Sequence, residues 1–471
     1  MRAFLGVDLG TSGLKAALLD EAGAVLAEAE AAYGMLSPQP GWAEADPVVW
    51  TAAYQCVRGE LAAVTAGVEL AGIGIAGQMH GVVLVDADGA LVRPAILWPD
   101  RRSEGVLSAW QRLPQRERAR LANPLAAGMA GPVLTWLALH EPETLRRAAT
   151  LLSPKDWLRS ALTGDRVTER SDASATLLWD VSADTWSQPA LAVAGISDAQ
   201  LPALRSCDEV VGTDDGVPVA AGGADVACAL QAMSAVWTGA LVVNAGSGVQ
   251  VLRPGVTPAP RVDPVTQLHA DSDGGWYEMV GVRNGGLSLA WVQRALRLSW
   301  PALFAAAGSA GPGAEVFVPF LTGERGGVAP VVPRAGWAGL SQSTGVADLA
   351  RAAFEALAFT IRRSVDLLGD SDSAVLLSGG VAREPYVRQL LANCLGRPLG
   401  YTPLRSASAV GAALLAARAV GADIRLPDDT MVVHPRVEDR LEAAYSRWRQ
   451  VVASTAQLSI PVHNPATIRD L

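Results

Sequence analysis

The chain has 471 residues, of which half are hydrophobic and 18% are charged, so it can bury sizeable cores and is not a disordered protein. Its 38 Lys and Arg against 47 Asp and Glu give a net charge of −9. The chain therefore lacks the broad basic surface with which proteins bind nucleic acids or anionic membranes. Four separate cysteines without a C-x-x-C pair argue against a disulfide framework and a zinc site. We expect a cytoplasmic protein, because Asp8 interrupts the first apolar run and no apolar stretch nears the ~20 residues of a membrane span.

Strands joined by tight turns are predicted over the first ninety residues. Apolar alternation indicates strands at residues 3–7, 14–19 and 25–33, which form a β-meander. A further strand carries residues 73–75, and we expect residues 82–85 to pair across or beside it. The N-terminal part is therefore predicted to be built on a sheet.

Helices are marked by their start and stop residues. Ser, Asp or Glu before Pro is typical of a helix beginning, and Gly after an apolar run is typical of its end. The predicted pairs of first and last signals are Asp46 and Gly67, Ser153 and Gly164, and Glu384 and Gly396.

The strand, glycine turn and strand of the N-terminus have a counterpart past the midpoint. Residues 240–243 lead into Gly246-Ser247-Gly248 and a second strand at 249–252, much as residues 3–7 lead into the turn that follows Asp8. The pattern suggests a duplicated α/β unit with a cleft between the copies, although Gly-Ser turns are common enough to recur by chance.

The two turns have the composition of phosphate-binding sites. Backbone amides in the first turn, with the hydroxyls of Thr11 and Ser12, can hold phosphate oxygens, and Asp8 can hold Mg²⁺ through water. An ordinary hairpin turn is the alternative, and the matching turn at Gly246 and Ser247 favours a polyphosphate held from two sides. Neither familiar nucleotide motif applies, since the G-x-G-x-x-G string at 72–77 is not followed by a helix and no glycine precedes a lysine.

Asp225 is the candidate general base. It follows the glycines of Gly222-Gly223-Ala224-Asp225, between a predicted strand and a helix-like run. Phosphoryl transfer needs a carboxylate that orients the attacking hydroxyl and accepts its proton, whereas a helix cap is the structural alternative. Gly379 and Gly380 end another strand, where a flat backbone suits a purine, while the small residues of 406–417 more often indicate close packing.

Together the motifs resemble the FGGY carbohydrate kinases, from about Ala3 to Arg418. They are Asp8-Leu9-Gly10-Thr11-Ser12-Gly13, Gly77-Gln78-Met79-His80-Gly81, Leu97-Trp98-Pro99-Asp100-Arg101-Arg102, Pro154-Lys155-Asp156-Trp157-Leu158, Ser171-Asp172-Ala173-Ser174, Gly222-Gly223-Ala224-Asp225, Leu321-Thr322-Gly323-Glu324-Arg325 and Gly379-Gly380.

The resemblance implies two ribonuclease-H-like lobes of the actin and hexokinase type, residues 1–236 for the sugar and 237–471 for the nucleotide, which close over ATP, Mg²⁺ and a sugar. It implies site residues as follows: Asp225 as catalytic base, Asp8 as a catalytic residue beside the metal, Met79 and His80 with Asp225 in the sugar pocket, Thr11, Ser12, Gly246 and Ser247 in the phosphate turns, and Gly379 and Gly380 at the adenine.

The implied reaction is ATP-dependent phosphorylation of a ketopentose at its terminal primary hydroxyl, with D-xylulose first. Val226 stands where Asn is usual after the catalytic Asp, which leaves open a kinase for another small ketose or polyol, such as ribulose or a deoxy sugar. A non-catalytic actin-like ATP-binding module is a third alternative, which the presence of both Asp8 and Asp225 disfavours. A homodimer is the oligomeric state that such families favour.

Overall fold

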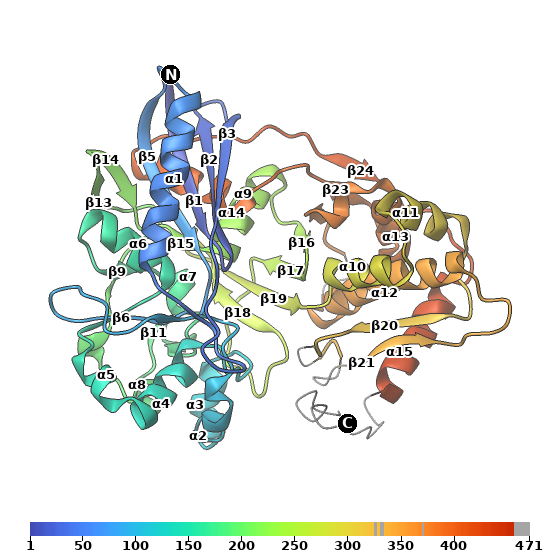
Figure 1. Cartoon of the computed structure of the whole chain (residues 1–471), viewed down its shortest axis with the longest axis horizontal. Coiled ribbons are helices and arrows are strands. Elements are labelled where there is room, and N and C mark those ends of the chain that lie inside the picture. The colour runs from blue at the N-terminus through green and yellow to red at the C-terminus, as the bar shows by residue number, and fades with distance from the viewer. Residues whose placement is uncertain (325–326, 330–333, 370–371, 456–471) are drawn as a thin grey trace, which may run out of the picture. The chain divides into compact units, whose positions relative to one another are not determined.

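The computed structural model describes residues 1–324, 327–329, 334–369 and 372–455, and the chain forms two compact units (Figure 1). Unit 1 comprises residues 1–242, 252–279 and 402–430, and unit 2 comprises residues 243–251, 280–401 and the chain from 431 onward. Each unit is thus assembled from segments distant in sequence. The division into functional lobes at residue 236 stays a prediction.

A mixed sheet forms the centre of unit 1, with strand order β13-β14-β5-β1-β2-β3. β1 and β2 are antiparallel, β2 and β3 are antiparallel, and β5 runs parallel to β1, so the predicted meander is confirmed. The short β15 also pairs with β5 in parallel. The bounds are β1 Arg2–Leu9, β2 Gly13–Asp20, β3 Val25–Ala32, β5 Glu69–Gly77, β13 Val210–Asp214, β14 Val217–Ala220 and β15 Gly223–Ala224.

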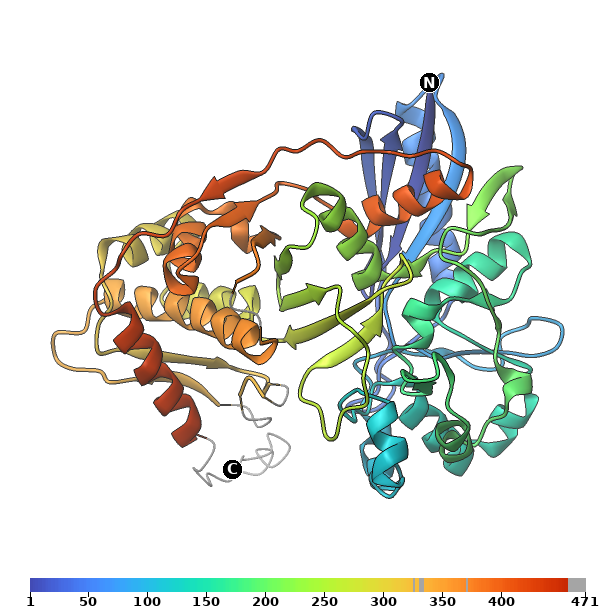
Figure 2. The same cartoon turned by 180° about the vertical axis from the view of Figure 1, so that it is seen from behind.

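Helices cover both faces of this sheet. Alternate side chains of β1, among them Leu5 and Val7, pack with α1 (Val48–Val64) and α6 (Pro154–Thr163), while Phe4 on the other face packs with α14 (Ala407–Ala419). α9 (Asp225–Val236) packs in turn against α14 (Figures 1 and 2). Alternate apolar side chains of the strands therefore point into two hydrophobic cores, one on each face of the sheet.

The contact of α14 with the sheet is a contact of backbones. A Cβ atom at Gly6 would lie 1.7 Å from the carbonyl oxygen of Ala409, and one at Gly74 would lie 1.9 Å from that of Ala412. Only glycine fits at such distances. The run of small residues at 406–417 is thus a close-packing helix, as its composition indicates.

The predicted start and stop signals of two helices, α6 and α13 (Pro385–Leu395), lie where the sequence places them. The side chain of Ser153 caps α6 by accepting from the backbone N–H of Asp156, and Gly164 ends the helix with φ of +82°. Gly396, with φ of +67°, ends α13 in the same way. α1 begins at Val48, one residue later than predicted, although the carboxylate of Asp46 still accepts the N–H of Val48 at 3.0 Å. The predicted end at Gly67 is wrong, because α1 stops at Val64 with Thr65 as its C-cap.

One predicted pairing is wrong. Residues 82–85 do not join the strand of Ile73 and Ile75, because β6 (Val83–Val85) pairs instead with β8 (Thr150–Leu152). His80 has a positive φ of 72°, which turns the chain away after β5. The side chains of Val82 and Leu84 then join a separate core cluster. The helices that contribute side chains to it are α2 (Leu107–Gln111), α4 (Ala130–His140), α5 (Pro142–Arg147) and α8 (Gln188–Ala194). α3 (Gln115–Arg120) lies in sequence between two of its residues, Leu113 and Leu121.

The second large sheet repeats the order of the first. Its order is β18-β19-β17-β16-β22-β23-β24, so β19-β17-β16-β22-β23 corresponds to β3-β2-β1-β5-β14. This common order confirms the duplicated α/β unit. The unit boundaries fall within β16, β17 and β19. The bounds are β16 Leu241–Ala245, β17 Val249–Pro254, β18 Gln267–Ala270, β19 Trp276–Val282, β22 Val375–Ser378, β23 Leu399–Tyr401 and β24 Met431–Val433.

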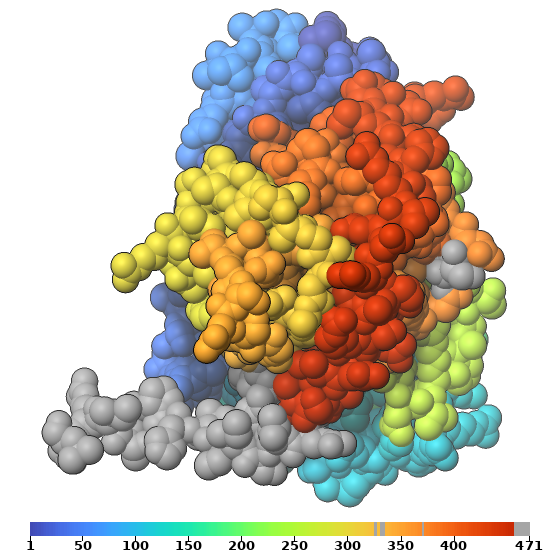
Figure 3. Space-filling model, turned by 90° about the vertical axis from the view of Figure 1, so that its right-hand side faces the viewer, coloured from blue at the N-terminus to red at the C-terminus, as the bar shows by residue number. Residues whose placement is uncertain are grey.

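Helices and a hairpin complete unit 2. α12 packs on α11 and on the hairpin of β20 and β21, and α15 packs on β20. The space-filling view shows the red segment that ends in α15 on the outside of this unit (Figure 3). No helix among the described residues is long and apolar enough to cross a membrane. The bounds are α10 Gly286–Ala295, α11 Trp300–Ser309, β20 Val316–Phe320, β21 Arg334–Ala338, α12 Val346–Leu367 and α15 Leu441–Thr455.

Candidate active site

Three parallel strands of unit 1 end at the same level of the sheet. Asp8 of β1 and Gly223 of β15 are both paired with Ala76 of β5. One edge of the sheet therefore carries Asp8 of β1, Met79 and His80, which follow β5, and Asp225, which follows β15. Ligands of open α/β sheets bind at the carboxyl ends of the strands. The structure thus brings together the residues predicted for catalysis and for sugar binding.

The turn that carries Asp225 is held by backbone contacts. Gly222 has φ of +80°, and a Cβ there would lie 2.0 Å from the carbonyl oxygen of Ile75. The N–H of Ala224 donates to the hydroxyl of Ser171 at 2.8 Å. Ala224 is the N-cap of α9 and makes no side-chain cap, and Asp225 is the first residue of the helix, with Oδ1 accepting the adjacent N–H of Val226 at 2.8 Å. Asp225 therefore does not serve as the helix cap.

Burial makes ionisation unfavourable for the carboxyl groups of both Asp8 and Asp225. Burial, and then the charge of Asp8, raise the pKa of Asp225 well above its ordinary value. Burial also raises the pKa of Asp8 to about 6, against the attraction of Lys15, its partner on β2. Oδ1 of Asp8 is buried and has no hydrogen-bond partner in the described structure.

These features of Asp8 fit a carboxylate that helps to hold a cation. A Mg²⁺ ion is bound by one or two carboxylates, with waters and phosphate oxygens completing its shell. No group of three His, Cys, Asp or Glu side chains in the described ranges makes a metal site by itself. Asp8 alone does not complete such a shell, so its role as a Mg²⁺ ligand stays a prediction that requires further ligands from a bound molecule.

A buried charge cluster lies behind the Asp225 turn. Nζ of Lys155 lies 2.6 Å from Oδ1 of Asp156, 3.4 Å from Oε1 of Glu169 and 3.3 Å from Oδ2 of Asp172. Glu169 accepts the N–H groups of Ser171 and Asp172, which begin α7 (Arg170–Ala173). Since Ser171 binds Ala224, the cluster fixes the loop that carries Asp225.

Lys155, Asp156 and Asp172 belong to motifs found in the sequence, where they have no assigned role, and Glu169 was missed. The available signal is Lys155, one of only two lysines in the chain, followed by an acidic residue at a helix start. Burial raises the pKa of Asp172, and the attraction of Lys155 opposes this rise.

The first hairpin turn is braced by neighbouring side chains. Oγ1 of Thr11 donates to Oε1 of Gln78 at 3.2 Å and accepts from the indole of Trp98 at 2.8 Å. The carbonyl oxygen of Gly10 accepts from Tyr33 at 2.6 Å. The hydroxyl of Thr11 is thus engaged within the protein, whereas Ser12 is exposed.

Met79 and His80 differ in their surroundings. Met79 is buried, and His80 is held in the left-handed region by the turn after β5. Nδ1 of His80 donates to the carbonyl oxygen of Ala175 at 2.6 Å, which fixes the orientation of the ring. The ring lies 5.9 Å from that of His269 on β18, measured between centroids.

Of the residues predicted for the nucleotide, Gly246, Ser247, Gly379 and Gly380 lie together in unit 2, whereas Thr11 and Ser12 belong to unit 1. The N–H of Gly246 donates to the carbonyl oxygen of Gly248 at 2.9 Å, which closes the second turn. Gly379 has φ of +97°, and a Cβ there would lie 2.5 Å from the carbonyl oxygen of Ala245. A Cβ at Gly380 would meet open space. The turn with Ser247 and the glycine pair therefore adjoin, and the backbone at Gly380 is accessible.

The start of α10 is a third element of this site, and the sequence analysis missed it. The N–H of Gly286, at the start of α10, donates to the carbonyl oxygen of Gly246 at 2.9 Å. The side chain of Asn284 is fully buried and donates to Glu324 and to the carbonyl of Gly323. The available signal is a glycine pair before a helix, as at Gly222. Arg325, the last residue of the Leu321 motif, lies outside the described residues.

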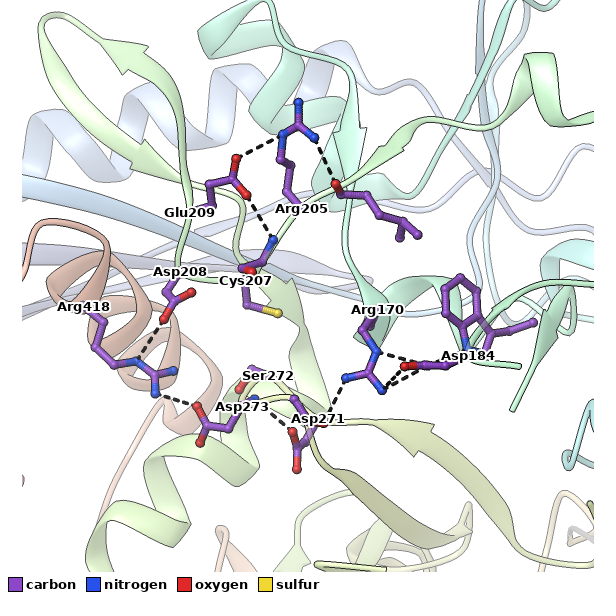
Figure 4. Close-up of a pocket in the computed structure, with 14 residues that line it drawn as sticks. Arg170, Asp184, Arg205, Cys207, Asp208, Glu209, Asp271, Ser272, Asp273 and Arg418 are labelled. Carbon is purple, nitrogen blue, oxygen red and sulfur yellow. Dashed lines mark hydrogen bonds and ion pairs between the residues drawn. The ribbon is translucent and has the colours of Figure 1, made fainter. Parts of the chain in front are cut away.

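A pocket of about 570 Å³ in unit 1 contains none of the predicted site residues (Figure 4). Arg170 pairs with Asp184, Arg205 with Glu209 and Arg418 with Asp273. Cys207 lies on its wall, and the carbonyl oxygen of Cys207 accepts the N–H of Gly222. Since each of these cations has a carboxylate partner, the pocket is not a preformed anion site.

Comparison with known proteins identifies the family. Residues 3–231 match the N-terminal domain, and residues 241–420 the C-terminal domain, of the FGGY family of carbohydrate kinases. The chain is 34% identical to the xylulose kinase of Escherichia coli over 88% of this chain and 89% of the relative, and 32% identical to that of Klebsiella pneumoniae over 96% and 98%.

A solved structure agrees with these sequence matches. The xylulose kinase of Rhodospirillum rubrum superposes with a TM-score of 0.86 at 26% identity, over 97% of this chain and 99% of that one. The expected class, two α/β lobes of the ribonuclease-H-like type found in actin and hexokinase, is thereby confirmed. The chain belongs to the FGGY family of carbohydrate kinases.

Proposed function

We propose that the protein is a xylulose kinase, which transfers the γ-phosphoryl group of ATP to the terminal primary hydroxyl of D-xylulose. The observation that carries the proposal is the alignment of Asp8, Met79–His80 and Asp225 at one edge of the unit 1 sheet. The names of the relatives at 32% and 34% identity support D-xylulose as the acceptor.

In this mechanism Asp225 is the catalytic base. Its carboxylate accepts the proton of the acceptor hydroxyl as the oxygen attacks phosphorus, and the turn of Gly222 and Ser171 holds it in place. The turns at Ser12 and at Gly246–Ser247 offer backbone amides to phosphate oxygens. Mg²⁺, for which Asp8 is the candidate ligand, supplies charge neutralisation at the phosphates when bound.

A coupled ADP-release assay over pentuloses, hexuloses, gluconate and glycerol tests the proposal. D-Xylulose is expected to give the highest kcat/KM, and Asp225→Asn to lower kcat by about 10²- to 10⁴-fold. Asp20→Asn, a carboxyl at the far end of the first hairpin, is the matched control and is expected to keep wild-type activity. No ADP release with any ketose, or full activity of Asp225→Asn, would refute the mechanism.

A second acceptor is favoured by one specific residue. Val226 is buried next to Asp225, and its side chain is apolar, so it offers no hydrogen bond to a sugar. Another small ketose or polyol, such as ribulose or a deoxy sugar, is therefore the alternative acceptor, and the same panel of substrates decides between them.

A further inference from the structure

Tyr277 is a buried tyrosine in unit 1 whose hydroxyl has no hydrogen-bond partner within the described chain. A buried tyrosine hydroxyl normally finds a partner, because an unpaired polar group inside a protein is costly. The position therefore either stores an unfavourable free energy or serves a group that binds there.

Tyr277 lies in a row of rings that begins in the candidate site. It is paired with His269 across β18 and β19, and the two rings lie 5.8 Å apart. The ring of His269 lies 5.9 Å from that of His80. Since the turn after β5 places His80 at the carboxyl edge of the sheet, the row connects Tyr277 to that edge.

The hydroxyl also lies in the field of the candidate base. Burial, and then the charges of Asp225 and Asp172, raise the pKa of Tyr277 well above its ordinary value. The phenol is therefore protonated at any working pH and can donate a hydrogen bond.

The neighbourhood of Asp225 needs such a donor. Val226 contributes only its backbone N–H, which Oδ1 of Asp225 already accepts at 2.8 Å. The sugar has several hydroxyls besides the one that reacts, and each of them loses water when the sugar binds.

We propose that the hydroxyl of Tyr277 donates a hydrogen bond to an oxygen of the acceptor sugar and so helps to select the acceptor. This role rests on the proposed function, because it assumes that a sugar binds beside Asp225. Tyr277 would be a substrate-binding residue supplied by the strand pair β18 and β19, far in sequence from the other residues of the sugar site.

The test is Tyr277→Phe, which removes one oxygen and keeps the ring. The KM for D-xylulose is expected to rise about 3- to 10-fold, as for one neutral hydrogen bond, with the KM for ATP unchanged. The melting temperature is expected not to fall, because the lost hydroxyl has no partner in the protein. Single-deoxy ketopentoses extend the test: for the analogue that lacks the recognised oxygen, wild type and variant are expected to have the same KM.

Tyr54→Phe is the matched control. The hydroxyl of Tyr54 is also buried, but it donates to Asp214 at 2.6 Å and accepts from Arg58 at 3.1 Å. Its loss is expected to lower the melting temperature and to leave the KM for D-xylulose unchanged. The two variants thus separate a binding role from a structural one.

The outcomes distinguish this proposal from the proposed function. Wild-type turnover of D-xylulose with an unchanged KM in Tyr277→Phe would overturn the role of Tyr277 alone, as would a melting temperature lowered as much as in Tyr54→Phe. Absence of wild-type turnover with any sugar would overturn the proposed function, and the role of Tyr277 with it.

Discussion

Replacing Asp8 by Asn is expected to stabilise the protein while it removes catalysis. Burial raises the pKa of Asp8 from 3.8 to about 6, so the ionised carboxylate is less favourable in the folded protein than in the unfolded chain. At 1.36 kcal/mol per pKa unit, the shift corresponds to at most about 3 kcal/mol. Roughly half of that is expected, because Asp8 as a whole is only partly buried although its Oδ1 is enclosed. A gain of about 1.5 kcal/mol raises the melting temperature by roughly 3 to 6 °C.

The pH dependence identifies the cause. A carboxyl whose pKa is higher in the folded state contributes its stability below the unfolded value of 3.8 and loses it as the pH rises through about 6. Asp8→Asn has no such loss, so its advantage over the wild type is expected to be full at pH 8, about half as large at pH 5, and absent below about pH 4.

Differential scanning calorimetry of both proteins at pH 5 and pH 8 measures this gain. Asp20→Asn is the control, because Oδ1 of Asp20 accepts two backbone N–H groups at the other end of the same hairpin, and it is expected to give no gain. Mg²⁺ with ATP is expected to raise the melting temperature of the wild type more than that of Asp8→Asn. An Asp8→Asn variant less stable than the wild type at pH 8 would refute the reasoning.

Three further predictions concern pH, packing and thiols. As the pH falls, kcat/KM is expected to decline well above pH 3.8, because the raised pKa of Asp225 means that this base is protonated at a higher pH than an ordinary carboxylate. A pH–rate profile that declines only at about pH 4 or below would contradict this role. Gly6→Ala is expected to cost about 3 kcal/mol or more in denaturant unfolding, since its Cβ would meet a backbone carbonyl at 1.7 Å. The exposed Gly59 in α1 has no such neighbour, so Gly59→Ala is expected to gain about 0.5–1 kcal/mol, and equal effects would show the packing argument to be wrong. Native protein is expected to react with Ellman's reagent at Cys56 alone, because the other three cysteines are buried; four rapid equivalents would contradict the structure.

Local patterns were sufficient for the elements but not for their partners. The strands of the first meander and the helix ends at Gly164 and Gly396 follow from residues within one turn or strand. The pairing of β6 with β8 depends on the positive φ of His80 and on a core cluster, which no short window of sequence contains.

The site shows the same division between local and distant information. Asp8 and Asp225 are each recognisable from a strand that ends in a turn, and the resemblance to a family assigned their roles. That Asp8 and Gly223, two residues before Asp225, both pair with Ala76 depends on strand register. Tyr277 and Asn284 became visible only through burial and hydrogen bonding, because a lone tyrosine or asparagine in a strand-rich segment has no distinguishing pattern.

The return of α14 to the first sheet has a consequence for how the chain folds during synthesis. The strands β1 and β5 leave the ribosome roughly 340 residues before α14 is complete, and at about 5–20 residues per second that interval is about 17 to 70 seconds. Throughout it, the face of the sheet around Gly6 and Gly74 lacks the helix that covers it in the finished protein. Nascent chains stalled before residue 407 are therefore expected to bind chaperones that recognise exposed apolar strands, and chains stalled well after residue 430 to release them.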